Sequence, residues 1–237
     1  MNSNKILCKN CSHQNPLYAY KCENCKSYLR ERIFNIDLWN IIGQLIENPL
    51  NAFKQIIFSE NKTFIIFLTI LIALKNLIIS RFFSMPKIGA DGVSTSLVVS
   101  YLILLSLTFI VLSVHTFAHY IIFKKSNKKL RFKDIYSTTV YAFIPYLFGL
   151  FLVFPVELIV FGGNLFSNNP YAFHIKPLPA YFLIGFEIIL FVWSLLLIYK
   201  GLIVKSANKL YSLVSTFIFL IIFIFSLVLS ALFVFSI

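Results

Sequence analysis

Charged residues are scarce in this sequence: they make up 13% of its 237 residues, and only nine are acidic. Soluble domains usually carry about 25% charged residues, so an ordinary soluble domain, a solvated disordered chain and a charged coiled coil are all excluded. Apolar residues make up 59% of the chain. This composition favours a polytopic membrane protein, because one helical span needs about 20 apolar residues.

The sequence also lacks the usual motifs of enzymes and of secreted domains. We find no nucleotide-binding loop, no Ser/His/Asp array and no zincin motif, so no enzymatic activity is predicted. The first 35 residues contain no apolar stretch typical of a signal peptide. The net charge of +12 does not indicate a nucleic acid partner, because Lys and Arg beside membrane spans are expected on the cytoplasmic side, where they set the orientation of the spans.

The chain divides into three segments: residues 1–30 are polar and contain every cysteine, residues 31–62 are amphipathic, and residues 63–237 are strongly apolar. The last segment contains five apolar runs, each long enough to cross a bilayer. We therefore expect an all-α polytopic membrane protein, with five transmembrane helices behind a small zinc ribbon and amphipathic interfacial helices. The predicted spans are about 63–83, 97–123, 136–162, 180–204 and 211–236.

The amphipathic segment predicts two short helices. Apolar residues recur at helical spacing from Ile36 to Ile46, and Asn48 followed by Pro49 indicates the start of a second helix. Two interpretations stay open: the helices lie at the membrane interface, or they form a linker packed on the membrane bundle.

The distribution of Lys and Arg predicts the orientation of the spans. Eight basic residues precede the first span, six follow the second and three follow the fourth, whereas the two other loops carry two and one. Basic loops stay on the cytoplasmic side. We therefore expect a multi-pass protein of the cell (cytoplasmic) membrane, with its amino terminus in the cytoplasm and its carboxyl terminus outside.

Two Cys-x-x-Cys pairs, Cys8/Cys11 and Cys22/Cys25, are separated by ten residues. Four thiolates in this spacing predict one tetrahedral structural Zn²⁺. An iron–sulfur site and redox-active dithiols remain alternatives. His13 is not expected to be a ligand, because four cysteines already close the site. A segment of this size cannot build its own core, so the metal would supply its folding energy.

Three ionisable residues lie inside predicted spans: Lys75, Glu157 and Glu187. The topology puts all three in the outer half of the bilayer, where they would share one cluster. Such residues are costly in a membrane and are candidates for function. The alternatives are a structural ion pair with one carboxyl protonated or snorkelling to the surface, or a functional group, which would be a proton or ion site or an outward-facing polar cavity.

His115 and His119 are four residues apart on the second predicted span, so they share a helix face. We favour a packed or hydrogen-bonded pair over a metal site or a proton relay. Pro145 and Pro155 should kink or loosen the third span.

The cysteine segment resembles the short zinc ribbons at the amino termini of many prokaryotic membrane proteins. Those ribbons usually have Gly directly after each Cys-x-x-Cys, where Gly relieves strain at positive φ. Here Ser12 and Lys26 occupy these positions.

Residues 45–235 resemble the prokaryotic branch of the YIP family, the five-span Ypt/Rab-interacting membrane proteins. The resemblance is carried by Asn48-Pro49, by Tyr141-Ala-Phe-Ile-Pro145 and by Trp193-Ser with Gly201-Leu. It implies an all-helical membrane domain with a cytoplasmic amino terminus. The Rab link of the eukaryotic relatives is not carried over to a ribbon-bearing chain of prokaryotic type.

Two functions follow as hypotheses. The first is a non-enzymatic membrane scaffold or adaptor, whose zinc ribbon binds a cytosolic protein or a second copy of the chain while the bundle lies in the lipid bilayer. The second is a small transporter or channel that uses Lys75, Glu157 and Glu187, and in addition the pair His115 and His119 on the inner side.

Overall fold

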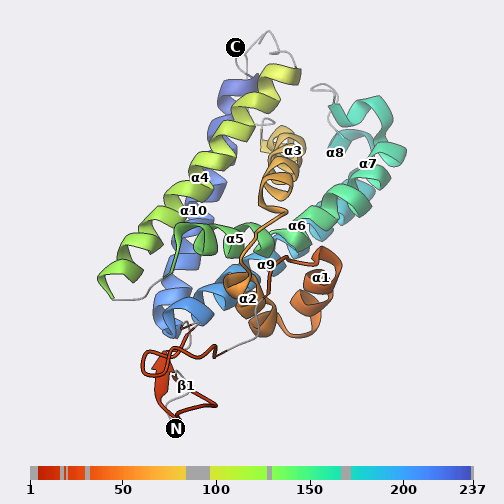
Figure 1. Cartoon of the computed structure of the whole chain (residues 1–237). Helices are drawn as coiled ribbons and strands as arrows, with labels where there is room; N and C mark the ends of the chain where they lie inside the picture. The colour runs from red at the N-terminus through yellow and green to blue at the C-terminus, as the bar shows by residue number, and fades with distance from the viewer. Residues whose placement is uncertain are drawn as a thin grey trace.

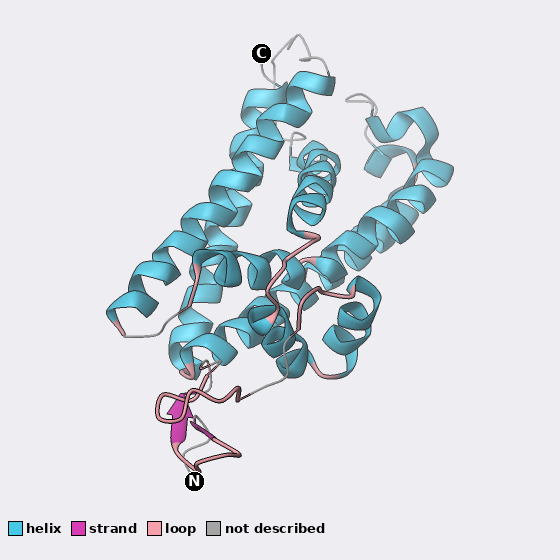
Figure 2. Ribbon diagram, in the orientation of Figure 1, coloured by secondary structure: helices cyan, strands magenta, loops and turns pink. Residues whose placement is uncertain are grey.

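The computed structural model describes residues 5–16, 19, 21–29, 33–83, 97–126, 130–166 and 172–235. Figure 2 shows a mostly helical molecule with a short two-stranded hairpin near the amino terminus. The elements are β1 (Lys5–Leu7), β2 (Gln14–Pro16), α1 (Leu38–Glu47), α2 (Pro49–Phe58), α3 (Ile65–Phe83), α4 (Leu97–Lys125), α5 (Phe132–Ala142), α6 (Ile144–Phe148), α7 (Phe154–Phe161), α8 (Ala172–Ile175), α9 (Pro177–Ser206) and α10 (Lys209–Phe235). A π-helical turn (Gly149–Val153) joins α6 to α7, and a 3-10 turn (Gly162–Phe166) follows α7.

Within the part of the chain that the structure describes, four helical segments are long and apolar enough to cross a bilayer: Val98–Lys125, Ile144–Phe161, Pro177–Ser206 and Lys209–Ser230. The first predicted span corresponds to a shorter apolar helix, Ile65–Ser80. Many large apolar side chains on these helices face outward, including Ile159 and Leu178, which are both 84% exposed. Outward apolar surface of this kind is suited to lipid, so the protein is a multi-pass membrane protein.

The helices pack around one central core, with α3 against α4 and α10, and α6 along α9 (Figure 1). The fully buried core includes Phe53 of α2, Ile72 of α3, Tyr141 and Phe143 of the third predicted span, and Phe219 of α10. The core therefore lies where helices that are distant in sequence meet.

The range of the third predicted span, 136–162, is divided into several helical segments in the structure. Residues 132–142 form the separate helix α5, whose buried positions include Asp134, Ser137 and Thr138. The helix breaks at Phe143, and the apolar membrane segment begins at Ile144. Pro145 stands in the first turn of α6 and Pro155 in the first turn of α7, directly after the π-helical turn. Both prolines interrupt the span as expected, because proline cannot donate a helical hydrogen bond.

The segment between the third and fourth predicted spans contains secondary structure of its own. The 3-10 turn and α8 occupy part of it, and α9 begins at Pro177 rather than near residue 180. Proline is favoured in the first turn of a helix, where no backbone donor is needed, which explains the earlier start.

The amphipathic linker forms two capped helices, as the sequence predicts. The Asp37 side chain accepts hydrogen bonds at the start of α1, and the Asn48 side chain accepts one from the Asn51 amide ahead of α2. Helix α2 packs on the bundle against α5 and α9, and a Cβ atom on Gly201 of α9 would lie 3.4 Å from the Phe53 ring. Helix α1 leaves Trp39 80% exposed. The linker is thus packed on the bundle through α2, while α1 presents an aromatic side chain suited to an interface.

Lys62 joins the linker to the bundle. Its ammonium donates to the carbonyl oxygens of Ile57 at 3.0 Å and of Ser59 at 2.8 Å at the end of α2, and it pairs with the Asp134 carboxylate of α5 at 3.3 Å. Arg131 binds the same carboxylate at 2.9 Å from an exposed position. Burial lowers the pKa of Lys62 to about 8, although Asp134 opposes the shift. Sequence reasoning treated Lys62 only as a topological charge.

We expect Asp134→Asn to lower the free energy of unfolding by about 3 kcal/mol, because it leaves the buried Lys62 ammonium without its counter-ion. Thermal unfolding of the purified protein in detergent measures the loss. The matched control is Arg131→Gln, which removes the exposed partner of the same carboxylate and should cost less than about 1 kcal/mol. Equal losses in the two variants would contradict the role of Lys62.

Candidate metal site and buried polar clusters

The cysteine module, residues 5–29, is built from the β1–β2 hairpin and two tight turns. The strands pair antiparallel, with Ile6 opposite Asn15. Each Cys-x-x-Cys closes a similar turn: the Ser12 amide donates to Cys8 O at 2.9 Å, and the Lys26 amide donates to Cys22 O at 3.1 Å. Ser12 and Lys26 have φ angles of 54° and 58°. Both positions after the cysteine pairs therefore adopt the left-handed conformation that Gly usually supplies.

The four cysteines converge on one point. Cys8 Sγ lies 3.5 Å from Cys25 Sγ, Cys11 Sγ lies 3.5 Å from Cys22 Sγ, and all four sulfur atoms lie within 4.8 Å of one another. Four thiolates around a tetrahedral Zn²⁺ would be about 3.8 Å apart, since a Zn–S bond is about 2.3 Å long. The module thus brings together a four-cysteine group that fits a metal ion.

Polar neighbours surround these sulfur atoms. Ser27 Oγ lies 2.9 Å from Cys25 Sγ and 3.2 Å from Cys8 Sγ, and the side-chain Nδ2 of Asn15 donates to Cys22 Sγ at 3.5 Å. Hydrogen bonds to thiolates orient metal ligands and stabilise their charge. Sequence reasoning did not identify Ser27 or Asn15, because their approach to the sulfurs depends on the folded turns.

The electrostatics of the module favour ionised thiols at part of the site. The hydrogen bond with Ser27 lowers the pKa of Cys8, and it lowers the pKa of Cys25 to about 6. The His13 backbone also lowers the pKa of Cys11, but burial and the neighbouring thiols outweigh it and raise this pKa to about 11. Four adjacent thiols cannot all ionise readily without a cation, which is the condition that metal binding satisfies.

We expect the purified protein to contain one metal ion per chain, and the double variant Cys22→Ser/Cys25→Ser to contain none. Elemental analysis by plasma mass spectrometry measures the stoichiometry and identifies the metal. His13→Ala is the matched control, because the exposed His13 side chain lies outside the four-cysteine group. Full metal content in the double variant, or loss in His13→Ala, would contradict the four-cysteine assignment.

The structure brings Lys75 of α3 and Glu187 of α9 together as an ion pair. Both residues are buried, with 0% and 4% of their surface exposed. Glu157 of α7 is also buried, and it is close enough to interact electrostatically with both. The structure therefore pairs Lys75 with Glu187 and buries the Glu157 carboxyl in α7.

Further polar residues adjoin this pair. Tyr146 donates to Asn76 Oδ1 at 3.0 Å, Asn76 donates to Thr108 Oγ1 at 2.9 Å, and the Tyr146 amide donates to Ser194 Oγ at 3.0 Å. The break at Phe143 explains the last bond, because it frees a backbone amide that an unbroken helix would use. Sequence reasoning missed this network, although Asn76 next to Lys75 in an apolar run was a signal for it.

His115 and His119 lie on one face of α4, with their ring centroids 4.4 Å apart. His119 engages the Tyr211 hydroxyl through Nδ1 and Ser215 Oγ through Nε2, at 2.8 Å for the second contact. Over the described ranges, only the cysteine module gathers three or more potential metal ligands. The two rings thus pack on each other, and the hydrogen bonds are made by His119, whereas His115 Nε2 has no partner among the described residues.

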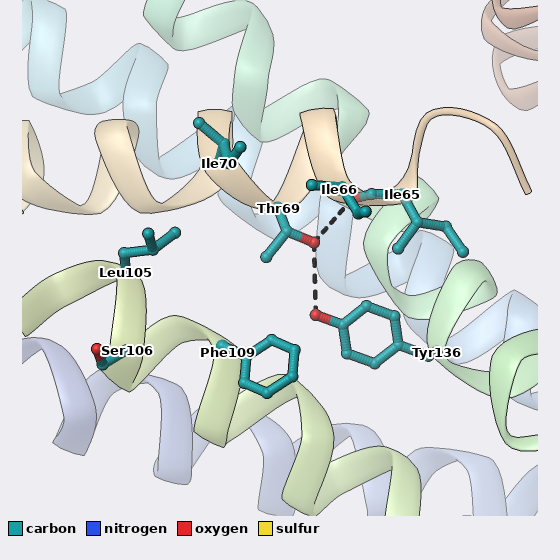
Figure 3. Close-up of a pocket in the computed structure, with 8 residues that line it drawn as sticks. All are labelled: Ile65, Ile66, Thr69, Ile70, Leu105, Ser106, Phe109 and Tyr136. Atoms are coloured by element: carbon teal, nitrogen blue, oxygen red, sulfur yellow. Dashed lines mark hydrogen bonds between the residues drawn. The ribbon is translucent and has the colours of Figure 1, made fainter. Parts of the chain in front are cut away.

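A groove of about 410 Å³ lies between α3 and α4, with Tyr136 of α5 at one end (Figure 3). Thr69 Oγ1 donates to Ile65 O at 2.8 Å and lies 3.4 Å from the Tyr136 hydroxyl. The other lining side chains are apolar apart from Ser106. This surface is suited to lipid contact and presents no catalytic group.

The comparisons do not identify relatives of this chain: no family model, no curated protein and no solved structure matches it. Its candidate sites therefore have to be interpreted from their own geometry.

Proposed function

We propose that this protein is a non-enzymatic membrane adaptor whose cysteine module holds one structural Zn²⁺ and binds a cytosolic protein. The observation that carries the proposal is the convergence of the four sulfur atoms within 4.8 Å of one another. Four cysteine ligands leave zinc no open coordination position, so the metal would fold the module rather than catalyse a reaction.

The surface of the module supports a binding role. Leu7 and Tyr28 are 61% and 57% exposed, which is high for apolar side chains in so small a unit. Lys21 lies over the Tyr28 ring at 4.9 Å from its centroid. Exposed aromatic and basic groups on a rigid support are typical of protein contact surfaces. Figure 1 shows the module at one end of the molecule, beyond the helices, where a partner has access.

The proposal includes a topology. Helix α3 serves as a fifth span beside the four longer apolar segments, and the amino terminus lies in the cytoplasm, as the basic loops indicate. The membrane part would then be a YIP-like domain, on the strength of Tyr141 to Pro145 and of Trp193-Ser with Gly201-Leu. A second copy of the chain is the alternative partner of the module.

Proximity labelling from the amino terminus in native cells tests the adaptor role. We expect wild-type protein to label a defined set of cytosolic proteins, and Cys22→Ser/Cys25→Ser to lose that set. Leu7→Ala/Tyr28→Ala separates folding from recognition, because it should keep the metal and lose the labelled partners. Identical bulk membrane neighbours for all three proteins would refute the adaptor role.

The second candidate function is a small transporter or channel. The second buried carboxyl group, that of Glu157, favours it.

We expect Lys75→Met to destabilise the protein by about 3 kcal/mol, because it removes the cation of a buried ion pair. Lys200→Met changes an exposed lysine of α9, the helix that carries Glu187, and should alter stability by less than about 0.5 kcal/mol. A stable Lys75→Met protein that has lost ion or solute flux in liposomes would instead support transport.

A further inference from the structure

Three helices each contribute one ionisable side chain to a buried cluster. Lys75, Glu157 and Glu187 are 0%, 2% and 4% exposed, respectively. If all three were ionised, the cluster would carry one uncompensated negative charge inside the membrane bundle. An unpaired buried charge is strongly disfavoured, so a buried carboxyl without a partner takes up a proton and becomes neutral. The charge count therefore calls for one additional monovalent cation, and the smallest is a proton.

The Lys75–Glu187 pair is tightly enclosed. A Cβ atom on Gly149, in the π-helical turn, would lie 2.5 Å from Glu187 Oε2 and 2.9 Å from Lys75 Nζ. A larger residue at this position would displace the charged ends of the Glu187 and Lys75 side chains, so Gly149 lets the backbone of the third span approach the pair closely. A π-helical turn is frequent at functional sites. Such close packing leaves little space for a hydrated metal ion beside the pair.

Glu157 lies on the seam between α7 and α9. Val153, Glu157 and Phe161 are spaced four residues apart, so they share one helix face, and Val153 and Phe161 pack against Ala180 and Leu183 of α9. Glu187 lies four residues beyond Leu183, on the same face of α9. The two carboxyl groups therefore lie along one seam.

Both carboxyl groups have unused hydrogen-bonding capacity. Among the residues that the structure describes, Glu157 Oε2 and Glu187 Oε2 have no hydrogen-bond partner. The charged and titratable groups near the cluster are Lys75 from α3, Glu187 from α9 and Tyr146 from α6, whose ring lies 5.9 Å from Lys75 Nζ. Beyond them, Lys176 donates to Val160 O at 3.0 Å from an exposed position at the end of α7. The Lys75 ammonium is thus the one buried cation near the carboxyl groups of Glu157 and Glu187 among the described residues.

We propose that Glu157 and Glu187 are alternative partners of Lys75 and together bind one exchangeable proton. Because Lys75 pairs with Glu187 in the structure, the proposal assigns the negative charge to Glu187 and the proton to Glu157, as a neutral carboxylic acid. When Lys75 moves toward Glu157, the proton leaves the Glu157 carboxyl and joins the Glu187 carboxylate, while Lys75 remains an ammonium. The cluster stays neutral in both arrangements. This proton site does not depend on the cysteine module.

Infrared spectroscopy of the purified full chain in lipid vesicles tests the proposal, because a neutral carboxyl has a C=O band that an ionised one lacks. The chain has only nine acidic residues, so the background is small. At neutral pH we expect one such band in wild type, which shifts in D₂O as its proton exchanges. Glu157→Gln should lose the band. Glu187→Gln should lose it as well, because Glu157 then becomes the ionised partner of Lys75.

Lys75→Met gives an independent readout, because without the ammonium both carboxyl groups should be neutral and the band should double. Glu47→Gln, which changes an exposed carboxylate of α1, should leave the wild-type band unchanged. If Glu157→Gln does not fold, Glu187→Gln and Lys75→Met still decide the question.

Three results would overturn the proposal: no band in wild type, a retained band in Glu187→Gln, or loss of the band on adding Na⁺ at constant pH. Metal content, measured on the same samples, should stay at the wild-type level in every variant. A change in it would show a failure of the cysteine module rather than of the proton site.

Discussion

The ion pair between Lys75 and Glu187 is the interaction around which the membrane helices are arranged. It joins α3 to α9, and it lies against the backbone of the third span at Gly149. Because no water in the bilayer core solvates a charge, each buried ionic group needs a partner from another helix. The neighbouring bonds of Asn76 with Thr108 and Tyr146 meet the same requirement, so polar contacts specify which helices meet.

A second group of buried charges connects the linker to the bundle. Lys62 binds the carbonyl groups that end α2 and the carboxylate of Asp134 in α5, so α2 is held against the broken third span. Helix α5 is polar enough to remain separate from the apolar segment that follows it. The interruption at Phe143 thus has two consequences: it places Asp134 beside Lys62, and it releases the Tyr146 amide to Ser194.

The cysteine module and the membrane bundle are stabilised in different ways. The bundle buries large apolar side chains such as Phe53 and Phe219. The module has too few residues for a core of this kind, and its four sulfur atoms converge where a metal ion would supply the missing stability. The proposed adaptor role uses this division, since a unit folded by a metal ion would present a contact surface outside the membrane while the bundle holds it there.

Local patterns in the sequence were sufficient for the cysteine group, the capped helices α1 and α2, the helical kinks at Pro145 and Pro155 and most of the apolar segments. These features depend on spacing, on capping chemistry and on the length of apolar runs, which act over a few residues. The sequence also predicted that Lys75 and Glu187 lie at similar depth. Three other features depend on residues far apart in the chain. They are the pairing of Lys75 with Glu187, the buried position of Lys62 and the separation of α5 from the third span. Contacts over such separations arise only when the helices pack, because their energy comes from excluding water or lipid around matched polar groups rather than from any local preference.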